Sequence, residues 1–234
     1  MSKLNFENTP VENTQKVDNK GCLKAIIVLI IFIIVVWSIG KCSDTKEEPF
    51  VSNNAISLND SISKAVTDVN EKAIAEENAT KAKQLKSLFV EKKDEFEPYT
   101  WIKPKSRPLY INQNGFYCYF IKNKDGSVNN FRFTGQYAAD DWLFIKYIKF
   151  NIDGKSFEFY PDEMNKDNDS EIWEWFDQNV RGTDIVLLNA IANAKSVKMR
   201  FVGQQYQKDK TMSSANIKSI KNTIEYYKAL GGKF

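Results

Sequence analysis

Residues 116–137 read FYCYFIKNKDGSVNNFRFTGQY, and this stretch decides the fold class. Apolar side chains alternate with other residues on both sides of its centre, as in Phe116, Cys118 and Phe120. Such alternation is typical of β-strands that turn one face to a core. The sequence KDGS lies between the two runs, and Asp125 and Gly126 suit a tight turn because both residue types tolerate positive φ. We therefore expect a β-hairpin.

Two further strands are expected immediately downstream. The run 142–152 is apolar on both faces at its start and on one face later, which favours a central strand. Asp153 and Gly154 then turn the chain into a short fourth strand that carries Phe157 and Phe159. Four successive strands with short turns predict an antiparallel meander.

The remaining sequence of this region changes to helical spacing. We expect a helix from Asp169 or Ser170 to Val180, a second over 183–194 and a third over 213–230, with a fifth strand over 197–201. Residues 101–234 therefore predict an α+β domain: an antiparallel sheet of about five strands with two or three helices on one face.

A long apolar segment lies upstream, where residues 25–39 read AIIVLIIFIIVVWSI without a charge. Counted from Gly21 to Gly40 it is long enough for a helix to span a bilayer, if Lys24 extends its ammonium to the headgroups. We expect a transmembrane helix over 25–40 after a disordered tail over 1–24. A cleaved export signal and lipidation at Cys42 are the alternatives.

The orientation of this span follows from lysines on its two sides. Lys16, Lys20 and Lys24 precede it and Lys41 and Lys46 follow it, which favours a cytoplasmic N-terminus and an extracytoplasmic C-terminal domain.

A linker and a helix join the span to the domain. We expect the linker over 41–58 and a helical stalk over 59–97, where Ile62, Val66 and Val69 lie on one face at helical spacing. The stalk is either a solvated helix or a coiled coil through which the chain forms a homo-oligomer.

The composition of the chain excludes many functions. With 33 Lys and Arg against 30 Asp and Glu, the net charge is only +3, so nucleic acid is not an expected partner. There is no histidine, which removes catalytic triads and histidine metal sites. Three cysteines are too few for a cysteine zinc site, and the sequence has no phosphate-binding glycine loop. We therefore expect no cofactor, no bound metal and no enzymatic activity.

Two groups of carboxylates are candidate sites. Asp140 and Asp141 are adjacent at the start of the expected third strand, where neighbouring side chains point to opposite faces, so they do not suit acid/base catalysis. The oxygen ligands of the loop 162–171 fit a calcium loop only in part, because Ile172 stands where the template needs glycine. We interpret this loop as solvated.

Basic residues at and after the fifth strand form the candidate interaction surface. They are Lys195, Lys198, Arg200, Lys208 and Lys210. Such a stripe suits an anionic lipid surface, a polymer or an acidic protein. We expect a single-pass membrane protein that presents a binding module to a protein or envelope component. A membrane-tethered enzyme that uses carboxylates and an oligomeric part of an envelope assembly are the alternative functions.

Overall fold

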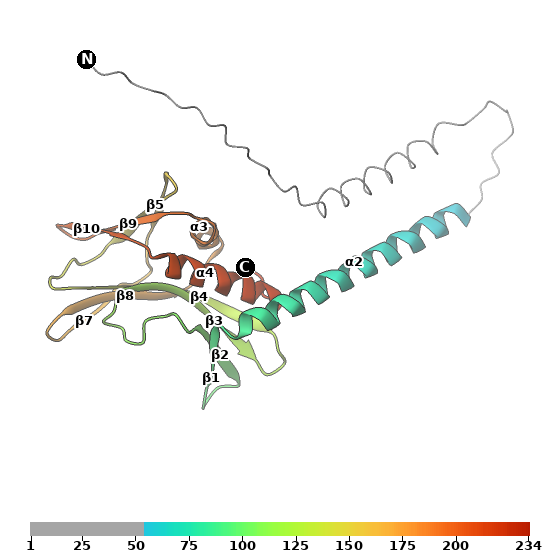
Figure 1. Ribbon diagram of the computed structural model, residues 1–234, viewed down its shortest axis with the longest axis horizontal. Coiled ribbons are helices and arrows are strands. Elements are labelled where there is room, and N and C mark those ends of the chain that lie inside the picture. Colours follow the sequence, from blue (N-terminus) through green and yellow to red (C-terminus); the bar gives the residue numbers. More distant parts are fainter. Residues whose placement is uncertain (1–53) are drawn as a thin grey trace, which may run out of the picture. The chain divides into compact units, whose positions relative to one another are not determined.

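The computed structural model describes residues 54–234, with side chains from Val69 onward. This part of the chain is α+β: it forms two antiparallel sheets and the helices α2, α3 and α4 (Figure 1). The expected α+β class is therefore confirmed. The predicted tail over 1–24, the membrane span over 25–40 and most of the linker lie outside the described residues. Among the described helices, none combines the length and the apolarity that a membrane crossing requires.

The larger sheet, sheet A, has six strands in the order β1-β2-β3-β4-β8-β7. Its strands span Phe89–Lys93 (β1), Tyr99–Pro104 (β2), Gly115–Asn123 (β3), Val128–Ala139 (β4), Asn165–Asn168 (β7) and Ile172–Asn179 (β8). The predicted hairpin is confirmed as the β3–β4 pair. Gly126 adopts a φ of +87° in its turn, and the Asp125 carboxylate accepts a hydrogen bond from the Ser127 N–H over 2.9 Å.

The smaller sheet, sheet B, has four strands in the order β10-β9-β5-β6. They span Tyr147–Ile152 (β5), Lys155–Phe159 (β6), Val197–Val202 (β9) and Gln207–Thr211 (β10). The strands expected over 197–201 and around Phe157 and Phe159 are therefore confirmed, but the single sheet of about five strands is wrong. Strand β5 pairs with β6 on one side and with β9 on the other, instead of continuing sheet A as a meander.

The strands form two sheets instead of one because the aromatic face of each sheet packs against that of the other. The ring centroids of Phe116 on β3 and Phe150 on β5 lie 6.1 Å apart, and those of Tyr137 on β4 and Phe201 on β9 lie 4.9 Å apart. Burial of such side chains is the largest favourable term in folding, so a second sheet stabilises an aromatic face as well as helices would. The core of the domain lies between these two layers.

Helix α4 (Ser214–Ala229) packs on strand β3 of sheet A, and helix α3 (Gly182–Ala192) packs against α4 (Figure 1). Tyr227 of α4 packs against Phe120 of β3 with ring centroids 5.2 Å apart. The Ser213 hydroxyl caps α4 by accepting a hydrogen bond from the Asn216 N–H over 3.1 Å. Both helices confirm the sequence-based prediction.

The helix expected up to Val180 is wrong, because Ile172–Asn179 forms strand β8 between β4 and β7. Trp173 and Trp175 lie on one face of this strand, while Phe176 lies on the other, at the core. Aromatic residues in this density favour a strand buried on both faces. Glu174 lies on the same face of β8 as Phe176 and is 1% exposed.

The start of the expected central strand also differs. Strand β5 begins only at Tyr147, and residues 142–146 form a loop. Phe144 in this loop has a φ of +52°, far from the negative φ of regular β-strand backbone. The carboxylate of the buried Glu174 binds three consecutive backbone N–H groups of the loop, and these groups are therefore not available for a strand ladder.

The helix expected over 59–97 ends earlier. Helix α2 spans Asn54–Lys86, and strand β1 follows it because Phe89 inserts into the core at 5% exposure. Ala82 and Leu85 on the last turns of α2 pack against the domain. The domain therefore begins near Phe89, upstream of the expected boundary at residue 101.

Candidate functional site

The five predicted basic residues do not form one surface. Lys198 and Arg200 lie on the outer face of sheet B, because Met199 and Phe201 between them point into the core. On β10 the register pairs Lys208 with Phe201 and Lys210 with Met199, which places both lysines on the opposite, inner side of the sheet. This part of the predicted surface is therefore corrected.

Lys210 is engaged at the edge of the core. Its ammonium donates a hydrogen bond to Asn114 Oδ1 over 2.6 Å and lies 4.8 Å from the ring centroid of Tyr137. Burial lowers the pKa of Lys210. Lys195 is exposed in the connection before β9, where its backbone N–H donates to the Asp153 carboxylate over 3.0 Å. Neither residue extends the face that carries Lys198 and Arg200.

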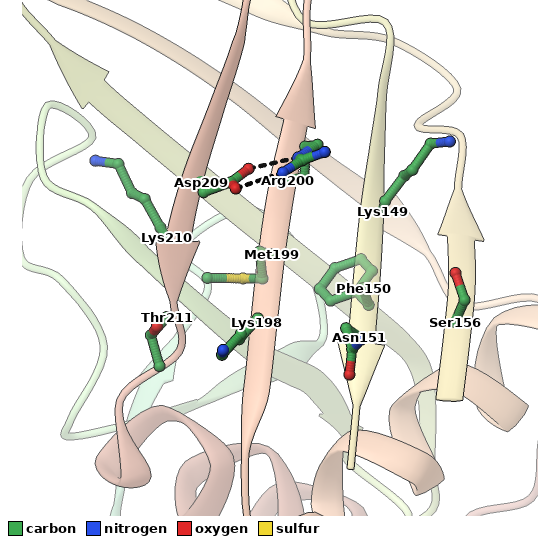
Figure 2. A pocket seen from close by; sticks show the side chains of 10 residues that line it. All are labelled: Lys149, Phe150, Asn151, Ser156, Lys198, Met199, Arg200, Asp209, Lys210 and Thr211. Atoms are coloured by element: carbon green, nitrogen blue, oxygen red, sulfur yellow. Dashed lines mark hydrogen bonds and ion pairs between the residues drawn. The ribbon is translucent and has the colours of Figure 1, made fainter. Parts of the chain in front are cut away.

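The outer face of sheet B holds an open groove of about 590 Å³. Figure 2 shows the side chains that line it, drawn from the four strands that lie side by side. Lys210 reaches the groove from the edge strand β10, and the other polar ones come from alternate positions of each strand: Lys149, Asn151, Ser156, Lys198, Arg200, Asp209 and Thr211. Strand alternation directs these residues outward and their apolar neighbours inward. The outer face of sheet B is therefore polar across its four strands.

Two cations lie directly opposite each other at the centre of this face. Lys149 of β5 pairs in register with Arg200 of β9. Opposed like charges destabilise a sheet, but each of these two cations is paired with an acid on the neighbouring edge strand. Lys149 Nζ lies 3.1 Å from Glu158 Oε1, and Arg200 binds both carboxylate oxygens of Asp209 over 2.6 Å each. The positive charge is therefore concentrated on β5 and β9, with the acids on the two flanking strands.

Hydrogen bonds keep these acids ionised. The Arg200 guanidinium lowers the pKa of Asp209. The Tyr160 hydroxyl, and then the Lys149 ammonium, lower the pKa of Glu158 by donating hydrogen bonds to it. The alternation of acid, base, base and acid across sheet B is therefore retained below neutral pH.

Lys198 adds a third cation to the same face. It pairs in register with Asn151 on one side and Thr211 on the other, and within the described residues it has no ion-pair partner. Its exposed ammonium can therefore bind a carboxylate or phosphate of a ligand. The amide and hydroxyl groups beside it supply neutral hydrogen bonds.

The carboxylates considered from the sequence do not converge in the described part of the chain. Asp140 and Asp141 are exposed after β4. The 162–171 segment contains strand β7 and the turn that leads to β8; in it, Asp162 forms an ion pair with Arg181 and Asp167 accepts a hydrogen bond from its neighbour's backbone. No three Asp, Glu or Cys side chains of the described residues gather closely enough to hold a metal ion.

Sequence reasoning missed three residues of this face: Lys149, Glu158 and Asp209. The alternation of Lys149 with Ile148 and Phe150 shows that it points away from the core. Its position opposite Arg200 could not be found in this way, because it depends on the pairing of β5 with β9, about fifty residues apart in sequence.

No protein-family model, curated protein or solved structure matches the chain. The function is therefore argued from the geometry of the domain.

Proposed function

We propose that the protein is anchored in a membrane by residues 25–40 and that its domain binds an acidic partner through the outer face of sheet B. The anchor is proposed from the uncharged apolar segment. The opposed pair of Lys149 and Arg200 carries the proposal for the binding face. An arrangement that costs stability and contributes nothing to the core is typical of a functional surface.

The charge pattern indicates the kind of ligand. A carboxylate that approaches the centre of the face meets Lys149, Lys198 and Arg200 together, while the acids lie to the sides. Exposed ion pairs contribute little individually, on the order of 0–1 kcal/mol each. Several simultaneous contacts and a high local concentration at the membrane would provide useful affinity. A protein segment or envelope polymer with closely spaced carboxylates fits this face best.

Binding is favoured over catalysis by the state of the acidic groups. Asp209 is paired with Arg200, which lowers its pKa, so this carboxylate is held ionised by a cation rather than poised to transfer a proton. An enzyme would need two carboxylates that face one substrate.

The binding face is tested with the full chain in detergent and a fluorescent poly-glutamate peptide as the probe. The variant Lys198→Glu should weaken binding at least tenfold. The matched control Lys155→Glu reverses an exposed charge at the start of β6, outside the groove, and should bind within twofold of the unaltered chain. Equal losses in both variants, or no binding at low salt, would refute the proposed face.

The anchor is tested separately. The intact chain should stay with the membranes after an alkaline carbonate wash, whereas a chain without residues 25–40 should be released. A reporter fused after Phe234 gives the orientation, which we propose to be extracytoplasmic. Recovery of the intact chain in the wash would contradict the anchor and leave the binding face to its own test.

A further inference from the structure

A second cavity, of about 980 Å³, lies at one end of sheet B, and it is separate from the groove on the outer face. It opens between the loop over 140–146 and the turn over 203–206 that joins β9 to β10. Its lining is Tyr137, Asp141, Trp142, Leu143, Val202, Gly203, Gln204, Gln205, Tyr206, Gln207 and Lys208. A cavity with aromatic and polar walls is the usual form of a ligand site.

The first wall of this cavity is fixed by a buried carboxylate. Glu174 accepts hydrogen bonds from the backbone N–H groups of Leu143, Phe144 and Ile145 over 2.8, 2.9 and 2.7 Å. Phe144 lies between the other two with a φ of +52°, a conformation that bulky residues rarely adopt. Residues held in such conformations are frequent at ligand sites, where the surrounding structure fixes them in advance.

The second wall is attached to the first. The Gln204 N–H donates to the Leu143 carbonyl over 3.1 Å, and the Gly203 N–H donates to the Tyr206 carbonyl over 2.9 Å. A Cβ atom at Gly203 would lie 2.0 Å from the Leu143 carbonyl oxygen, so only glycine allows this approach. The two walls therefore form one preformed unit.

The backbone contacts bear on which ligand class fits. An extended peptide that adds to a sheet needs free backbone donors and acceptors. The backbone groups of Leu143, Gly203 and Gln204 named above are already bonded within the protein, so these parts of the two walls present side chains to a ligand. Recognition there by side chains suits a ligand with hydroxyl groups, whereas a peptide strand would add at the unpaired edge of β10, beside Gln207 and Lys208.

The side chains that line the cavity match a sugar in two respects. Tyr206 is 69% exposed, and the partly buried Trp142 stacks on Phe144 with ring centroids 5.6 Å apart, so two aromatic rings adjoin the space in which the C–H faces of a pyranose would pack. Gln204 and Gln205 carry amides that both donate and accept hydrogen bonds, as sugar hydroxyls require.

The charges of the cavity lining indicate an uncharged ligand. Asp141 and Lys208 are the two charged residues of the lining, and their charges are opposite. We propose that this cavity binds a neutral oligosaccharide, with Trp142 and Tyr206 as the stacking platforms and the glutamines as hydrogen-bond partners. The site is independent of the face proposed for acidic partners.

The test uses the full chain and soluble chito-, cello-, malto- and xylo-oligosaccharides, with calorimetry and saturation-transfer NMR as readouts. At least one of these sugars should bind. Tyr206→Ala and Trp142→Ala should each weaken it at least tenfold, while Trp142→Phe should retain most of the affinity. Tyr160→Ala is the matched control, because Tyr160 is 59% exposed and stacks on Tyr147 outside the cavity.

Failure of this test is distinct from failure of the proposed function. If none of the sugars binds, or if the Tyr206 and Trp142 variants bind as well as the unaltered chain, the oligosaccharide site is wrong. Binding of poly-glutamate at this cavity, lost in Tyr206→Ala and retained in Lys198→Glu, would also overturn it in favour of a peptide site. Because Tyr206 is largely exposed, Tyr206→Ala should leave the unfolding midpoint unchanged. A loss of sugar affinity without a shift of this midpoint is then a local effect at the cavity.

Discussion

Replacement of Glu174 should destabilise the domain more than any other single change of charge on β8. The unaltered carboxylate accepts hydrogen bonds from three backbone N–H groups at 2.7–2.9 Å, two of them buried and one part-buried, and Glu174 itself is 1% exposed. Glu174→Ala removes the carboxylate that accepts all three hydrogen bonds. A buried donor left without a partner costs roughly 1–3 kcal/mol, so we expect a loss of about 3 kcal/mol or more.

Glu174→Gln is the sharper test because it preserves shape. An amide oxygen can still accept from Leu143 and Phe144, but the amide NH₂ then faces the Ile145 N–H, donor against donor. One hydrogen bond is lost and two lose their charge assistance, which predicts a loss of about 2 kcal/mol. For a domain of this size, such a loss lowers Tm by about 4–8 °C.

The assay is urea unfolding followed by tryptophan fluorescence, combined with hydrogen exchange at the Phe144 and Ile145 amides. Glu171→Gln is the matched control, because Glu171 is exposed just before the same strand. If Glu174→Gln stays within about 0.5 kcal/mol of the unaltered chain, the range of ordinary surface substitutions, and both amides keep their protection, the carboxylate does not fix the loop.

Three other predictions concern the core of sheet A. Gly135→Ala places a Cβ atom 2.3 Å from Cε1 of Phe176, so we expect a loss of about 1–3 kcal/mol in urea unfolding, and an unchanged midpoint would contradict this. Burial, followed by the hydrogen bond to Asp177, raises the pKa of Tyr119 above its ordinary value of 10.0. Above that pH the unfolded phenol ionises while the folded one stays neutral, so stability should fall, and the fall should be shallower in Tyr119→Phe. Burial raises the pKa of the Cys118 thiol, so in a chain whose other cysteines are serine it should react with iodoacetamide only on unfolding; rapid labelling of the folded chain would disprove this.

Elements with one apolar face could be predicted from the sequence. The β3–β4 hairpin, α3, α4 and β9 each show their period within a few residues, because apolar side chains recur on the side that packs on the core, although β3 is buried on its other face as well. Strands β7 and β10 carry almost no apolar side chains, since they read NKDN and QKDKT at sheet edges. Backbone hydrogen bonds to the neighbouring strand hold β7 and β10 in place, and the local sequence pattern does not indicate this pairing.

The error at β8 has a specific cause. In the sequence, Asp169, Glu171 and Glu174 resemble the capped and acidic first turns of a helix. Glu174 instead points into the core, where its partners lie about thirty residues earlier in the chain. The density of tryptophan and phenylalanine was the signal that favoured a strand. The candidate surface failed at Lys208 and Lys210 for a related reason, because their side of the sheet follows from the register of β10 on β9.

The direct passage from α2 into β1 has a mechanical consequence. Only two residues separate Lys86, the last of the helix, from Phe89, where β1 begins its pairing with Pro104 at the border of sheet A. Tension carried by the helix would first break the salt bridge between Lys81 and Glu225, which spans 3.4 Å. The pull would then reach the sheet at its outermost strand and peel it away one residue pair at a time, so the protein would yield to force at its N-terminal border while β3 and β4 stayed folded.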